Sequence, residues 1–212
     1  GLPPALASAS VHLSEVFTTA VSGTSHWRLG NIDKKLVTKL LLPGMIGGAV
    51  GAYLLTSIPG DVIRPYLSLY LALMGIYIIW KALRRKTSNT RTDTPKYTSV
   101  LGVVGGFFDA IGGGGWGPIV TTTLLARGNN PQKTVGSVNL SEFAVTLTQS
   151  IVFLLTLKVI AWNVVAGLIV GGVLAAPLGA LMVRRVPAKA LMGIIGVLII
   201  TLSLRTMILA WL

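Results

Sequence analysis

Long apolar stretches alternate with short polar ones along the chain. The apolar stretches cover residues 5–23, 36–57, 65–80, 97–127, 134–157, 161–183 and 188–212. Several hold about 20 residues, which is enough for a helix to cross a hydrocarbon core about 30 Å thick. A polar, basic segment interrupts this pattern in the middle of the chain. The pattern predicts an all-α, polytopic integral membrane protein with a first half at 1–80, a linker at 81–96 and a second half at 97–212.

Composition supports membrane insertion. Charged residues make up 11% of the chain and the mean hydropathy is +0.76, whereas soluble domains carry about 25% charged residues. The net charge of +12 would indicate nucleic acid in a soluble chain, but here the basic residues lie in short loops, so no nucleic-acid partner is expected. With no cysteine and two histidines, disulfides and a zinc centre are not expected, nor is any cofactor.

A glycine-rich break interrupts the fourth apolar stretch, where residues 109–118 read DAIGGGGWGP. Such a run cannot form a lipid-facing helix, because its backbone N–H and C=O groups would find no partners in hydrocarbon. Broken helices in transporters point their positive N-terminal ends at a midplane anion site. The alternative is close helix packing, but packing motifs space small residues four apart, whereas these glycines are contiguous.

The chain is an internal duplication. SVHLSE at 10–15 and SVNLSE at 137–142 agree at five of six positions, with an offset of 127 residues. At the same offset Gly1 and Pro4 match Gly128 and Pro131. With an offset of 128, Ile32, Gly44, Gly51 and Pro59 match Ile160, Gly172, Gly179 and Pro187. We therefore expect two structural repeats, with the glycines of 36–57 spaced for close helix contact.

Basic residues predict the orientation, because cytoplasmic loops are enriched in Lys and Arg. The linker carries Lys81, Arg84, Arg85, Lys86, Arg91 and Lys96, and is therefore assigned to the cytoplasm. If 97–127 crossed the membrane, Arg184, Arg185 and Lys189 would lie outside, against the rule. If it enters and returns as a re-entrant hairpin, only Lys158 lies outside. The hairpin is favoured, which would make the two halves inverted repeats of about three transmembrane helices each.

These motifs resemble one known family. GGGGWGP, GSVNLSEF, SVHLSE and HWRLGNID look like the sulfite exporter TauE/SafE family, also called the 4-toluene sulfonate uptake permeases. The resemblance covers nearly all of the chain. It implies a multi-pass carrier of the cell (inner or plasma) membrane that transports sulfite, sulfonates or related anions.

The family pattern also includes a glycine-rich segment ahead of each half, and nothing precedes Gly1 here. We therefore expect the natural gene to encode a further such segment upstream. Its broken tip would lie beside His12 and Glu15.

An oxyanion needs several N–H or O–H donors, and the backbone amides of 113–117 would supply donors without a full positive charge. Asn139 lies three residues before Glu142, so the two share a helix face, and His12 and Glu15 are their repeat counterparts. The predicted substrate-binding residues are Gly113, Gly114, Gly115, Trp116, Gly117, Ser137, Asn139, Ser10 and His12. For Asn139 and the serines the alternative is hydrogen bonding between helices.

Glu15 and Glu142 each lie about eight residues inside an apolar stretch. An unpaired carboxylate at that depth is costly when ionised, so both are predicted to couple transport to protons, or to organise the glycine-rich tip. Asp109 precedes the glycines and is assigned the same roles, with capping of the broken helix as the structural alternative.

The sequence does not favour an enzyme. Ser14 and Ser141 stand next to glutamates, but the second half has no histidine to complete a nucleophile and base. The predicted function is a secondary, proton-coupled transporter of small sulfur-containing anions that works by alternating access in membrane lipid. The alternatives are a carrier of Na⁺ or a metal cation, and a non-transporting scaffold or assembly factor. A homo-oligomer is compatible with the sequence.

Overall fold

The structure is a computed structural model that describes residues 2–84 and 95–182, together with positions 186–187, 189–190, 193–194, 196–197, 200–201, 204–205 and 208. The described residues form helices and no strand. The helices are α1 (Pro4–Arg28), α2 (Lys34–Ser57), α3 (Gly60–Arg84), α4 (Thr98–Gly112), the π-helix η1 (Gly117–Thr121), α5 (Thr122–Ala126), α6 (Pro131–Thr156) and α7 (Trp162–Met182). The all-α prediction is confirmed.

The starts of α1, α2 and α6 follow from local sequence. Pro4 and Pro131 begin α1 and α6, where a proline loses no helical hydrogen bond. Asn130 caps α6 by accepting from the Lys133 amide at 3.0 Å. Asp33 caps α2 by accepting from the Lys35 amide at 2.9 Å.

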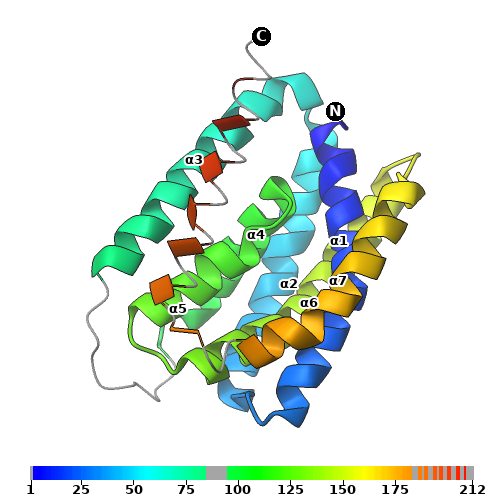
Figure 1. Ribbon diagram of the computed structural model, residues 1–212. Helices are drawn as coiled ribbons and strands as arrows, with labels where there is room; N and C mark the ends of the chain where they lie inside the picture. The colour runs from blue at the N-terminus through cyan, green and yellow to red at the C-terminus, as the bar shows by residue number, and fades with distance from the viewer. Residues whose placement is uncertain are drawn as a thin grey trace.

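The two predicted halves pack into one bundle. Helix α1 lies against α6 and α7, while α2 lies against α4 and α6 (Figure 1). Glycines let α2 and α4 approach each other closely: a Cβ at Gly47 would collide with the Val103 carbonyl, and one at Gly106 with the Gly44 carbonyl. This is the close helix contact predicted for the glycines of 36–57.

The chain reverses direction after α4. Gly113 ends the helix with φ 67°, and Gly114 follows with φ 136°, both conformations that glycine adopts without strain. The Arg127 guanidinium then lies 4.5 Å from the centre of the Tyr97 ring. The two ends of the segment 97–127 therefore lie side by side. The result is a hairpin, α4 to α5, as the charge count favours. Its orientation in a membrane stays a prediction.

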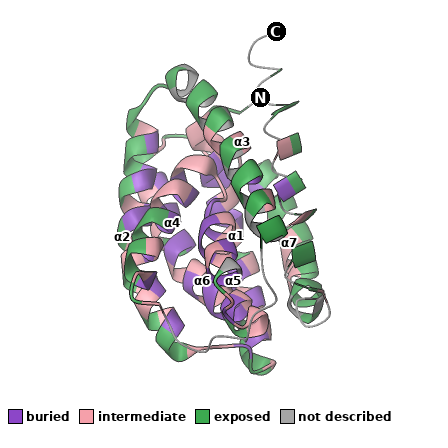
Figure 2. Cartoon of the chain, turned by 90° about the vertical axis from the view of Figure 1, so that its left-hand side faces the viewer, coloured by how far each residue is buried: buried purple, intermediate pink, exposed green. Residues whose placement is uncertain are grey.

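Buried residues lie at the centre of the bundle and exposed residues on its outside (Figure 2). The buried residues include many polar side chains, and the exposed ones include many large apolar side chains. Three described helices are long and apolar enough to cross a membrane, at Lys34–Ser57, Pro131–Thr156 and Trp162–Gly179. The multi-pass prediction is therefore confirmed. The 188–212 stretch and linker residues 85–94 lie largely outside the described residues, and the domain boundaries and the inverted relation of the halves stay predictions.

Candidate functional site

The centre of the bundle is built around Asp109, at the end of α4. Its side chain is 0% exposed. Its Oδ1 accepts from the backbone amides of Gly115 at 2.7 Å and Trp116 at 2.8 Å. Its backbone carbonyl accepts from Gly113 at 2.9 Å and Gly114 at 3.2 Å. A single residue thus binds four consecutive amides of the glycine run, which is the capping alternative weighed for Asp109.

The second carboxylate oxygen of Asp109 faces α6 and α1. Gln149 Nε2 donates to Oδ2 at 3.0 Å, and also to the Gly106 carbonyl at 3.2 Å. The Nδ1 atom of His12 lies 3.9 Å from Oδ2. The carboxylate is therefore held between three helices, α1, α4 and α6.

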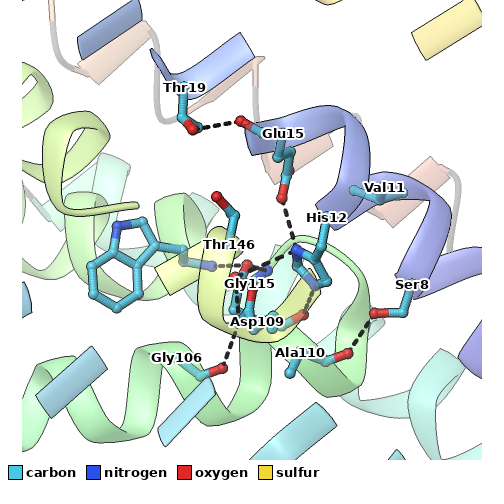
Figure 3. A network of polar contacts seen from close by, with 12 residues as sticks. Ser8, Val11, His12, Glu15, Thr19, Gly106, Asp109, Ala110, Gly115 and Thr146 are labelled. Atoms are coloured by element: carbon cyan, nitrogen blue, oxygen red, sulfur yellow. Dashed lines mark hydrogen bonds and ion pairs between the residues drawn. The ribbon is translucent and has the colours of Figure 1, made fainter. Parts of the chain in front are cut away.

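His12 connects the two acidic residues of this centre (Figure 3). Its Nδ1 lies 2.8 Å from Glu15 Oε2, and its Nε2 lies 3.2 Å from the Asp109 carbonyl oxygen. The imidazole is 0% exposed and stacks on Phe153, with ring centres 5.9 Å apart. Glu15 keeps 24% of its side chain exposed, so the cluster is open to its surroundings at that residue alone among the three.

Two further contacts fix the hairpin tip. The Ser8 hydroxyl on α1 donates to the Ala110 carbonyl at 2.6 Å. The Trp116 indole donates to the Val138 carbonyl on α6 at 3.1 Å. The Trp116 ring is fully buried against Gly44 and Val145. Sequence reasoning named Trp116 as a substrate-binding residue, which stays a prediction, and it missed Ser8. It also missed Gln149, although a polar glutamine inside an apolar span indicates a buried hydrogen-bond partner.

Three further predicted residues lie on α1 and α6, and each has a hydrogen-bond partner within the bundle. Ser10 donates to the Leu6 carbonyl at 2.8 Å, within its own helix. Ser137 accepts from the Asp33 amide at 2.7 Å. Asn139 accepts from Ser22 at 3.0 Å, which joins α6 to α1. The Ser137 and Asn139 contacts join α6 to other segments, which is the alternative weighed for these residues, whereas the Ser10 contact stays within α1.

The candidate residues fall into two groups. His12, Glu15, Asp109 and the tip amides form one cluster, which we call the His12 cluster, and Glu142 is half-buried near enough for its charge to interact with Glu15 and Asp109. Asn139 instead lines a cavity of about 340 Å³. The other lining residues are Thr18, Thr19, Ser22, His26, Val135, Gly172, Ala175, Ala176 and Gly179.

The tip of the α4–α5 hairpin lies beside His12. The glycine faces of α2 and α4 pack together and carry Asp109 and Ala110 to α1. The upstream glycine-rich segment expected beside His12 and Glu15 stays a prediction.

An all-helical bundle with a broken, polar hairpin buried at its centre is the architecture of a membrane transporter. Comparison with known proteins agrees. The family model "Sulfite exporter TauE/SafE" matches residues 1–206, and the chain belongs to this family. It is a multi-pass protein of the cell membrane, with a small-molecule substrate and lipid as its surroundings.

Two relatives carry transporter names. The chain is 44% identical over 218 residues to the "Probable membrane transporter protein YtnM" of Bacillus subtilis (strain 168), covering 100% of this chain and 73% of that protein. It is 28% identical over 118 residues to the "Probable membrane transporter protein ORF9" of Sinorhizobium sp, covering 55% of this chain and 45% of that protein. No solved structure matches the chain.

Proposed function

We propose that this membrane transporter carries a small sulfur-containing anion, such as sulfite or an organosulfonate, coupled to protons and by alternating access. Membership of a sulfite exporter family supports the substrate class. The proposal assigns no catalytic role to any residue.

The observation that carries the proposal is the binding of a carboxylate by the hairpin tip. The amides of Gly115 and Trp116 both donate to Asp109 Oδ1, so the tip provides a donor pair for an oxyanion within the bundle. The donors are neutral, which allows a bound anion to leave again. The same cluster holds Glu15 and Asp109, with Glu142 close by, as candidates for proton coupling.

Flux into proteoliposomes tests the proposal. Labelled sulfite and a labelled organosulfonate should enter vesicles that contain the protein, faster with a pH gradient than without one. Gly115→Ala is expected to abolish the flux, because its Cβ would lie 3.0 Å from the Asp109 amide nitrogen and the Phe108 carbonyl. Gly171→Ala is the matched control, because it lies outside the candidate site and no neighbouring atom lies within 4 Å of its Cβ position.

A cation carrier is the second candidate. One potential ligand atom from each of His12, Glu15 and Asp109 lies within 4.8 Å of the other two, a spacing that suits a metal ion. Uptake of labelled Na⁺ or a divalent metal, without uptake of sulfite or sulfonate, would favour this carrier. A folded protein that moves none of these ions would instead favour a scaffold.

A further inference from the structure

The hydrogen bonds of His12 locate a proton. A carbonyl oxygen only accepts, so the 3.2 Å contact between Nε2 and the Asp109 carbonyl places a hydrogen on Nε2. Nδ1 then faces Glu15 Oε2 at 2.8 Å, where a bare nitrogen lone pair and an ionised carboxylate would repel each other. The contact therefore contains one more proton, either on Nδ1 or on Oε2. His12 and Glu15 together hold one exchangeable proton.

A second carboxylate faces the same nitrogen. Asp109 Oδ2 lies 3.9 Å from Nδ1, and it is fully buried. From α6, Glu142 adds a further acidic group near Glu15 and Asp109, and from α3 the Tyr70 hydroxyl lies near enough to interact with the Asp109 charge. Among the described residues, His12 is the basic side chain that lies beside these carboxylates, and it carries a positive charge only when both ring nitrogens hold a proton. Protons are therefore the available means of neutralising the excess negative charge, which is costly inside a membrane.

Exposure gives the cluster a direction. Glu15 is 24% exposed, whereas His12 and Asp109 are each 0% exposed. Glu15 is therefore the residue of the three at which a proton can enter the cluster, and His12 lies between it and Asp109. Transfer from His12 to Asp109 needs the 3.9 Å separation to close by about 1 Å to hydrogen-bond length. The proton on Nδ1 passes to Oδ2, and the Nδ1 lone pair then accepts the next proton, from Glu15.

Protonation of Asp109 would free the hairpin tip. An ionised carboxylate is a much stronger acceptor for the Gly115 and Trp116 amides than a neutral carboxylic acid. We propose that Asp109 is an internal competitor of the transported anion: it occupies the tip amides when ionised, and releases them to the anion when it receives a proton through Glu15 and His12. The inference rests on the proposed function, and it sets a stoichiometry of one proton taken up with each monovalent anion bound.

Binding of methanesulfonate to the purified full chain in detergent tests this inference, because this anion keeps its charge across the working pH range. Calorimetry repeated in buffers with different heats of ionisation should record about one proton taken up per anion. The Kd should fall about tenfold for each unit that the pH is lowered. Asp109→Asn should remove both the proton uptake and the pH dependence. Asp33→Asn is the matched control: it makes the same substitution at the cap of α2, where Asn caps equally well, and should retain both.

Each other outcome counts against the proposal in a distinct way. Anion binding by the wild-type chain with no proton uptake would overturn the inference and leave the proposed function standing, and this readout does not depend on any variant folding. A tenfold change of Kd per pH unit that is retained in Asp109→Asn would also overturn the inference. No methanesulfonate or sulfite binding at any pH would count against the proposed function itself. Binding of Zn²⁺ with release of protons, lost in Asp109→Asn, would make the cluster a metal site.

Discussion

Trp116 is expected to be the main packing anchor of the hairpin tip, and Trp116→Ala tests this. The side chain is 0% exposed and lies in the apolar cluster of Leu40, Val120 and Val145. Replacing a buried Trp by Ala typically costs about 3–5 kcal/mol, as lost contacts and a residual cavity. Lipid tails are as apolar as the core, so the transfer part is small here and the lower end, about 3 kcal/mol, is expected.

This free energy corresponds to a measurable shift in melting temperature. For a chain of this size, 1 kcal/mol lowers Tm by roughly 2–4 °C, so Trp116→Ala should lower it by roughly 6–12 °C. Thermal unfolding in detergent, followed by size-exclusion chromatography, measures the shift. Trp27→Ala is the control, because Trp27 is 65% exposed. Equal shifts for the two variants would refute the assignment of Trp116 as an anchor.

Three other predictions concern transport, topology and packing. Glu142→Gln is expected to abolish proton-driven transport while leaving substrate exchange largely intact, and transport like that of the wild-type chain across pH would reject its coupling role. A cysteine at Lys158 should react with an impermeant label from outside, and one at Lys189 only after permeabilisation; outside labelling at Lys189 would reject the orientation. Gly47→Ala should destabilise the chain in a detergent melt, because its Cβ would meet the Val103 carbonyl, whereas Gly171→Ala should have little effect, because no atom lies within 4 Å of that position.

The sequence predicted the features that depend on local patterns. The helical spans follow from the apolar stretches, and the break after α4 follows from the contiguous glycines. The cap could also be predicted, because Asp109 lies three residues before the glycine run, although sequence alone left its role open between capping and proton coupling.

What the sequence did not predict depends on which helices meet. The hairpin tip bonds to His12 and Ser8, which are about 100 residues away along the chain. That contact results from the close approach of α2 and α4, which a spacing pattern indicates but does not assign to a partner helix. Gln149 was overlooked for the same reason, because its role appears only when Asp109 reaches α6.

The movement of protons with the anion is the most direct test of proton-coupled anion transport through the hairpin tip. Proteoliposomes loaded with a pH-sensitive dye would be given an inward gradient of methanesulfonate, with K⁺ and valinomycin to hold the membrane potential at zero. The account predicts that vesicles with the wild-type chain become acidic inside, and that vesicles with Asp109→Asn do not. Entry of methanesulfonate without acidification in the wild-type vesicles would contradict it.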